Sequence, residues 1–479
     1  MKWKFFINSF RIISSLVFPL IILPYVTRVL QPLGFGKVDF ASSIIAIFMM
    51  LSTLGIPTYG IRLVAQHRQN NNELSGNVKQ LLLLQMIGIV ICYLTFFICL
   101  FFYAKMRDEK LLFLVLSLSI FMNGVGIDWF FSGMEEYGYI TIRNVVIQMV
   151  SICLILLLVK KPSDYIIYAG ISVFSSVGTN LLNLFYLKNR INWRVKITFN
   201  LLPHIKGSIV FFVLILIGTS LTKLESIMIG SLMNYQDVGI YAAANKIIQC
   251  AIGVFTGIGM TFLPTLVELM KKDRDKFNDI LGKSIDLVYF VSVPTCVALY
   301  ILAPQLIDLV VGVKYHASIE PFRILVLIIY VVTLNTVVGN QILIATHKEI
   351  YAMIPISVLA VVSPIINYIL IPLYGVNGAA MSLLITSLIC AGVQLKLAVR
   401  INPIKLFTKN RVKYIIASIF MALCVMSFVN LKISLVFIIL LSSVSYGFLL
   451  IIMKEYIMIE HIGKVYRFIN FKLKSREQR

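Results

Sequence analysis

Charged residues inside long apolar segments are the positions where this sequence can do chemistry. Lys223 and Lys246 lie deepest, about 16 and 8 residues into their apolar segments. A charge at the centre of a membrane-spanning helix costs about 2.5–3.5 kcal/mol on insertion scales, so its side chain must face protein or water. An ammonium group in a watered cavity can pair with an anion such as a phosphate. The two lysines therefore predict a cationic cavity.

The remaining intramembrane charges leave two interpretations open. Those nearest the segment ends can reach the headgroups or face a polar interior, and they are Arg28, Asp39, Asp128 and Asp286. Glu225 is two residues from Lys223, so the two side chains point to different helix faces and cannot neutralise each other. We expect one to face the cavity and the other a neighbouring helix.

Arg28 is expected to join Lys223 and Lys246 in the cationic cavity, because first and second spans of two lobes can face a central cleft. The alternative is that Lys246 pairs with a neighbouring acid while Arg28 reaches the outer headgroups.

Other kinds of site find no support in the sequence. It has no GxxxxGK[ST] and no complete GxGxxG, so no nucleotide or dinucleotide site is expected. Its five histidines are scattered and its seven cysteines lie in apolar stretches without a CxxC, so no metal site is expected either. We predict a protein without cofactor that is not an enzyme.

The elements that must position these charges are transmembrane helices. Hydrophobic residues make up 59% of the 479 residues and charged residues 13%, which excludes soluble and disordered proteins. The sequence predicts an all-α polytopic membrane protein with about 14 (12–14) spans, whose expected segments are 10–30, 38–58, 80–103, 111–131, 141–159, 165–187, 207–230, 238–263, 284–305, 321–346, 351–373, 376–398, 414–430 and 432–453.

An internal repeat indicates how the spans are grouped. The segment 36–44 resembles the segment 239–247, which lies 203 residues later. We expect two parallel six-helix lobes around a central cavity, followed by two C-terminal helices. The predicted boundaries are 1–187 for the first lobe, 188–206 for a cytoplasmic interfacial linker, 207–398 for the second lobe, and 399–479 for the last two spans and a basic tail.

The distribution of lysine and arginine sets the orientation. About 30 lie on the side that carries both termini and about 8 on the other. We therefore expect cytoplasmic N- and C-termini in a cytoplasmic (inner) membrane. The net charge of +22 is spread over short loops rather than over one solvated face, so nucleic-acid binding is not expected.

Four segments in chain order resemble signatures of the polysaccharide-biosynthesis flippases, the O-antigen and capsule repeat-unit transporters. The first is Pro24-Tyr-Val-Thr-Arg28-Val-Leu with Gly34-Phe-Gly36, and the second is 55–68, which contains Arg62. The third and most specific runs from Asp128-Trp-Phe-Phe-Ser-Gly to Arg143-Asn144, and the fourth is 371–380. One departure is Gln31, where the family usually has glycine.

The resemblance implies the two-lobe fold of the multidrug/oligosaccharidyl-lipid/polysaccharide exporter superfamily. It also implies the substrate, a polyprenyl-pyrophosphate-linked oligosaccharide repeat unit turned from the inner to the outer leaflet for O-antigen, capsule or exopolysaccharide synthesis. Membrane lipids, a polysaccharide polymerase and glycosyltransferases are the partners it implies. The main alternative is a cation-coupled multidrug exporter of the same superfamily. Two further alternatives are a polymerase or ligase that acts on the outer face, and a membrane scaffold that does not transport.

Overall fold

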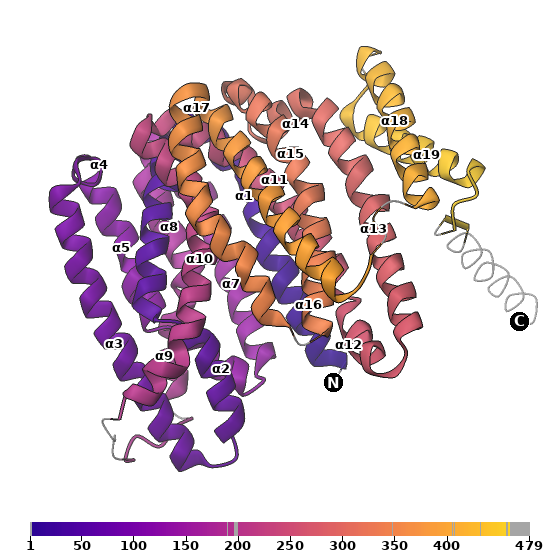
Figure 1. The fold of residues 1–479 in the computed structure, drawn as a ribbon. Helices are drawn as coiled ribbons and strands as arrows, with labels where there is room; N and C mark the ends of the chain where they lie inside the picture. Colours follow the sequence, from indigo (N-terminus) through magenta and orange to yellow (C-terminus); the bar gives the residue numbers. More distant parts are fainter. Residues whose placement is uncertain are drawn as a thin grey trace, which may run out of the picture. The chain divides into compact units, whose positions relative to one another are not determined.

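The computed structural model describes residues 2–188, 190–195, 200–346, 348–404, 406, 408–431, 433–456 and 458–459. Every regular element in these residues is helical, as Figure 1 shows. The helices are α1 (Lys2–Thr53), α2 (Ile56–His67), α3 (Asn71–Phe102), α4 (Ala104–Asp108), α5 (Lys110–Gly124), α6 (Asp128–Gly133), α7 (Tyr137–Leu158), η1 (Pro162–Asp164), α8 (Tyr165–Val177), α9 (Thr179–Leu187), α10 (Leu202–Leu232), α11 (Tyr235–Met260), α12 (Leu263–Lys272), α13 (Arg274–Ile301), α14 (Ala303–Val310), η2 (Val313–Ser318), α15 (Ile319–Asn335), η3 (Thr336–Gln341), α16 (Ile342–Ala345), α17 (Glu349–Ile401), α18 (Lys409–Asn430) and α19 (Leu435–Ile452).

Ten helical stretches of the described residues are long and apolar enough to cross a membrane. Their outward faces are apolar too: α3 exposes Val90, Leu94, Phe97 and Phe101 along one stripe. Lipid is the solvent in which such a face is stable. The protein is therefore a polytopic, all-helical membrane protein.

Two of these stretches are far longer than one span requires. Phe18–His67 and Met353–Ile401 have 50 and 49 residues, whereas a span needs about 20. Within them, α1 bends at Gln31 (φ 58°, ψ 173°) and α17 at Gly375 (φ 59°, ψ −135°). Both bends coincide with turns that the sequence predicts between consecutive spans.

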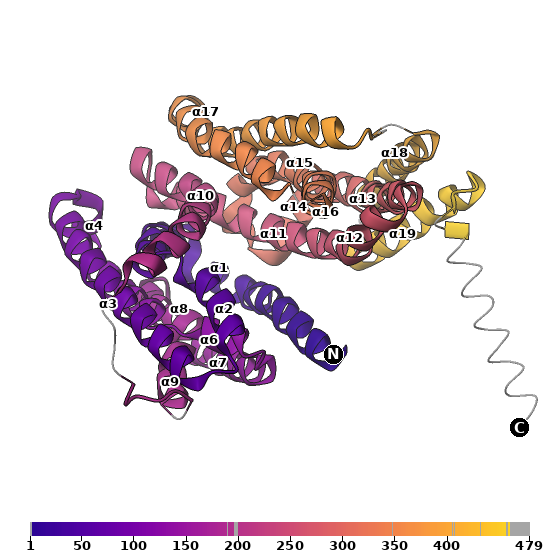
Figure 2. The same cartoon turned by 60° about the horizontal axis from the view of Figure 1, so that its bottom comes forward.

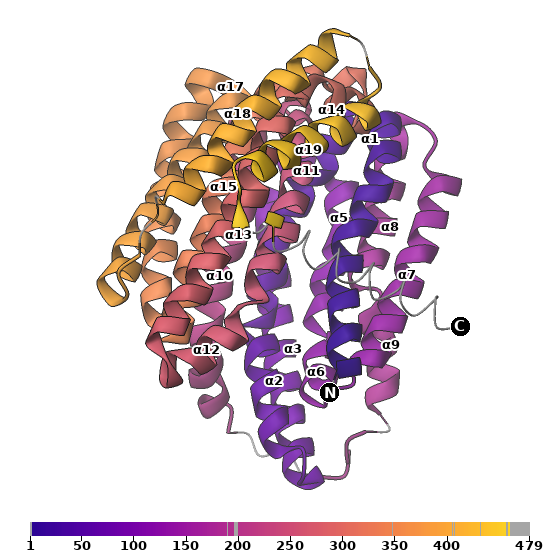
Figure 3. The same ribbon diagram turned by 90° about the vertical axis from the view of Figure 1, so that its right-hand side faces the viewer.

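The chain divides into two compact units. Unit 1 comprises Met1–Cys250, Asp308–Pro321 and Ile356–Thr386, and unit 2 comprises Ala251–Ile307, Phe322–Pro355 and Ser387–Arg479. In unit 1, α1 is the central helix, against which α3, α5, α7, α8 and α10 all pack. Figure 3 shows the indigo α1 running beside α5.

One end of unit 1 is held by a cluster of large buried side chains from α2, α3 and α6, among them Trp129, Phe130 and Phe131. Glycines allow these helices to approach closely. A Cβ on Gly60 would lie 2.5 Å from the Trp129 ring, and one on Gly133 would lie 2.7 Å from Val64. Figure 2 shows α2 and α6 side by side. This packing fixes the short helix that begins at Asp128.

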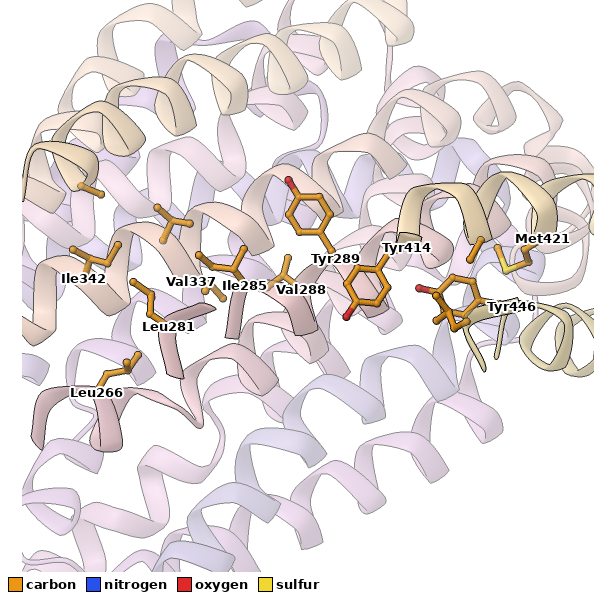
Figure 4. Close-up of a cluster of buried hydrophobic side chains, with 14 of the residues drawn as sticks. Leu266, Leu281, Ile285, Val288, Tyr289, Val337, Ile342, Tyr414, Met421 and Tyr446 are labelled. Atoms are coloured by element: carbon orange, nitrogen blue, oxygen red, sulfur yellow. The ribbon is translucent and has the colours of Figure 1, made fainter. Parts of the chain in front are cut away.

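In unit 2, α18 packs against α13 and α19 packs against α18, over the apolar core drawn in Figure 4. Polar contacts accompany this core. Arg411 Nε donates to Asp286 Oδ1 at 2.6 Å, and Tyr456 Oη donates to Asp286 Oδ2 at 3.2 Å. Of the two interpretations that the sequence leaves open for Asp286, the structure therefore supports an interior ion pair.

Candidate functional site

Unit 1 contains a cavity of about 270 Å³ between α1, α10 and α11. Helix α1 contributes to it from both sides of its bend. The lining residues are Pro19, Leu20, Leu23, Asp39, Thr222, Lys223, Ser226, Ala242, Asn245, Lys246, Gln249 and Cys250. The cavity therefore joins segments that are about 200 residues apart in the sequence.

The three charged residues of the cavity lie at a similar depth. At a rise of about 1.5 Å per residue, Asp39 is about 12 Å from the α1 bend, Lys223 about 14 Å from the end of α10 and Lys246 about 16 Å from the start of α11. The hydrocarbon core of a bilayer is about 30 Å thick. Each of the three residues thus lies about 12–16 Å from a helix end or bend, about half the thickness of the hydrocarbon core.

Asp39 is the most firmly held of the three. Its side chain is 13% exposed, and its Oδ2 accepts a hydrogen bond from Ser226 Oγ at 2.8 Å. Lys246 Nζ is 3.9 Å from Asp39 Oδ1 and 4.5 Å from the centre of the Phe35 ring. The first distance fits an ion pair but is too long for a hydrogen bond, and within the described residues no hydrogen bond leaves this ammonium group.

Lys223 and Glu225 point in different directions, as their two-residue spacing predicts. Lys223 lines the cavity, and among the described residues no hydrogen bond or ion pair reaches it. Glu225 is 2% exposed, and Asn367 of α17 lies beside it. Of the two, Lys223 is therefore the one available to a molecule in the cavity.

The structure does not bring Arg28 to the two lysines. Its side chain is exposed, and its Nη2 donates to the carbonyl oxygen of Leu309 at 2.6 Å. Leu309 lies in the last turn of α14, where carbonyl groups lack helical partners and a cation is favourable. The expectation that Arg28 lines the cavity with Lys223 and Lys246 is therefore corrected: it caps a helix instead.

The charges of the most specific sequence signature form a second polar cluster in unit 1. The side chain of Arg143 is 5% exposed. Its Nη2 donates to Asp128 Oδ1 at 2.8 Å and to Asn144 Oδ1 at 3.1 Å, and its Nη1 donates to Asn183 Oδ1. This cluster ties α6 to α7 and α9. Arg62 is exposed on α2. Among the described residues it belongs neither to this cluster nor to the lining of the cavity.

Several cavity residues are not among the charged candidates. Asn245 and Gln249 line it, and Gln249 Nε2 donates to Asn245 Oδ1 at 3.2 Å. Their four-residue spacing places them on one face of α11, and Lys246 follows Asn245 directly. The spacing is visible in the sequence, but only the structure shows that this face of α11 lines a cavity. The cavity thus offers two cations, one anion and neutral amides.

The sequence is similar to one known family and to two curated relatives. The sequence profile of the family described as "Polysaccharide biosynthesis protein" matches residues 3–270. Two relatives named "Putative O-antigen transporter", from Shigella dysenteriae and Escherichia coli strain K12, are 22% and 21% identical, each over 80% of this chain and over 96% and 92% of their own lengths.

Solved structures share the fold. The lipid II flippase MurJ in an inward closed conformation has a TM-score of 0.74 at 15% identity, covering 95% of this chain and all of its own. An outward-facing multidrug resistance transporter of the MATE family and the MOP superfamily has a TM-score of 0.52 at 15% identity, over 82% and 93% of the two chains. Because the family profile matches more than half of its residues, this chain belongs to the polysaccharide biosynthesis protein family.

Proposed function

We propose that this protein is a flippase that moves polyprenyl-pyrophosphate-linked oligosaccharide repeat units from the inner to the outer leaflet of the cytoplasmic membrane. The observation that carries the proposal is that Lys223 and Lys246 line one cavity, at about 14 Å from the end of α10 and about 16 Å from the start of α11. Family membership, the names of the two relatives and the flippase fold of MurJ all support a lipid-linked oligosaccharide as the cargo.

The cavity suits the part of the substrate that is hardest to move. The pyrophosphate group carries negative charge that hydrocarbon does not solvate, whereas the polyprenyl tail can stay in the lipid. Ammonium groups in a watered cavity lower the cost of carrying that charge by pairing with it. An inside-negative membrane potential favours outward transport by about 2.3 kcal/mol per 100 mV for each negative charge that crosses the whole membrane. Transport therefore needs neither ATP nor catalysis.

The same proposal includes the layout that the sequence predicts. It comprises fourteen spans in two parallel lobes, a cytoplasmic linker at 188–206, and both termini in the cytoplasm of a cell whose glycosyltransferases build the repeat unit. A polymerase on the outer face would consume the product as O-antigen, capsule or exopolysaccharide. Residues 189 and 196–199 of the linker, and 457 and 460–479 of the basic tail, lie outside the described residues.

A cation-coupled multidrug exporter is the second candidate, favoured by the carboxylate of Asp39 in the cavity. A cationic drug would pair with that carboxylate. However, the two lysines outnumber it and give the three groups a net charge of +1, which favours an anionic ligand. We therefore rank the exporter below the flippase.

Reconstitution tests the proposal directly. Purified protein is placed in ATP-free vesicles that contain a fluorescently labelled polyprenyl-pyrophosphate oligosaccharide, and dithionite added outside bleaches the exposed label. The expected result is that vesicles with protein lose most of the label while empty vesicles lose only the outer half. Protein vesicles that bleach like empty ones, or that need ATP to differ from them, would refute it.

A further inference from the structure

The cavity contains a carboxylate where a purely cationic anion site would have none. Asp39 and Lys246 both line the cavity, and their side chains form an ion pair with 3.9 Å between Nζ and Oδ1. A carboxylate at this position repels a phosphate and occupies a lysine that a phosphate needs. Its presence lowers the affinity of the site for an anion, and it therefore calls for a functional explanation.

The two partners of the pair are held unequally. Asp39 accepts a hydrogen bond from the buried Ser226 at 2.8 Å and is 13% exposed. The side chain of Lys246 is 42% exposed and contacts the Phe35 ring face at 4.5 Å. A lysine has a flexible four-carbon stem and three donors, so the ammonium group can move while the carboxylate stays in place.

We infer that Asp39 is the release residue of the transporter, a fixed carboxylate that competes with the substrate phosphate for Lys246. This inference rests on the proposed function. While the cavity is empty, Asp39 neutralises Lys246 and leaves Lys223 as the first contact for the pyrophosphate. The bound pyrophosphate draws Lys246 away from Asp39, and the carboxylate takes the ammonium back as the substrate leaves. Asp39 thus acts on the substrate through Lys246, as a positioning residue.

The competition keeps the affinity low enough for turnover. A site with two unopposed lysines would bind the pyrophosphate more tightly in both orientations of the transporter. Tighter binding of this kind lowers the rate of release without helping the crossing. Removing the carboxylate should therefore raise affinity and lower the rate of repeated transport, which a merely structural role would not do.

The test uses the full-length protein in detergent with farnesyl pyrophosphate as the probe, and calorimetry gives the affinity. We expect Asp39→Asn to bind roughly tenfold more tightly than wild type, with slower dissociation in stopped-flow measurements and slower multiple-turnover flipping in vesicles. Asp39→Ser removes the same charge and provides a second reading if the first variant folds poorly. Asp237→Asn is the matched control, because it removes a negative charge from α11, the helix of Lys246, at a position outside the cavity lining, so it should leave binding at the wild-type affinity.

The outcomes separate this inference from the proposed function. If Lys223→Ala and Lys246→Ala weaken binding while Asp39→Asn and Asp39→Ser leave it equal or weaker, the cationic cavity stands and the release role is wrong. If wild type does not bind the probe, or if the lysine variants bind it as wild type does, both the cavity and the release role are wrong.

Discussion

Gly36 and Gly239 pack against each other's helices in a reciprocal way. A Cβ on Gly36 would lie 1.7 Å from the carbonyl oxygen of Tyr235, and a Cβ on Gly239 would lie 2.0 Å from that of Pro32. Each glycine therefore contacts the residue four positions before the other glycine. This is the contact expected of two segments related by a local two-fold axis. The two glycines begin the segments 36–44 and 239–247, for which the sequence predicts an internal repeat.

Replacement of either glycine by alanine should destabilise the protein. No flexible side chain can yield at these two contacts, because the opposing atoms belong to the backbone. Overpacking of this kind costs typically about 1–3 kcal/mol, and we expect Gly36→Ala and Gly239→Ala each to lower the melting temperature in detergent. Gly218→Ala is the control, since nothing lies within 4 Å of its would-be Cβ. Equal melting temperatures for all three variants would contradict the close crossing.

Gln31 occupies a backbone conformation that suits glycine. Its φ of 58° and ψ of 173° lie in a region that costs other residues about 1–3 kcal/mol. We expect Gln31→Gly to raise the melting temperature, because the relief of strain exceeds the added freedom of the unfolded chain, about 0.4–1 kcal/mol. The reverse change, Gly375→Ala at φ 59°, should lower it. A Gln31→Gly variant less stable than wild type would show that contacts of the glutamine side chain stabilise the protein by more than the backbone strain costs.

Arg143 holds the second polar cluster together, so its removal should be costly. Arg143→Ala leaves Asp128 and Asn183 without their cation. Because the Asp128 side chain is 42% exposed and water can solvate it, we expect a loss of about 1–3 kcal/mol, below the about 3–5 kcal/mol of a fully buried pair. Asp128→Asn should be milder, because an amide oxygen still accepts from the guanidinium group. Protein abundance in isolated membranes measures both, with the exposed Arg62→Ala as the control. Normal abundance of Arg143→Ala would contradict a structural role for the cluster.

The predicted orientation can be tested by cysteine labelling in a background without the seven native cysteines. Asn192 is exposed in the predicted linker, and Lys161 is exposed in a predicted outer loop. A membrane-impermeant maleimide applied to intact cells should label Lys161→Cys and leave Asn192→Cys unlabelled until the membrane is opened. The opposite labelling pattern would show that the protein has the reverse orientation in the membrane.

Much of the architecture could be predicted from the sequence because a bilayer imposes simple rules. Long apolar segments, their charges and their interruptions at Gln31 and Gly375 are all local features of the chain. The same locality explains why Lys223 and Glu225 could be assigned to different faces.

Contacts between distant segments could not be predicted in this way. Arg28 reaches a carbonyl 281 residues away in α14, and Ser226 anchors Asp39 from 187 residues away. A basic side chain at the end of a span can reach headgroups, a cavity or a helix terminus, and only the tertiary structure decides among them. The correction at Arg28 and the role inferred for Asp39 both arise from such contacts.

The most direct test of the central claim is the flipping rate of lysine variants in ATP-free vesicles. Lys223→Ala and Lys246→Ala should each reduce the rate severely, the corresponding arginine variants should retain part of it, and glutamate variants should be worse than alanine because like charges would then meet. Lys206→Ala, an exposed lysine on the same helix as Lys223, should flip at the wild-type rate. If well-folded Lys223→Ala and Lys246→Ala proteins both flip as fast as Lys206→Ala, the cationic cavity is not the route of the substrate.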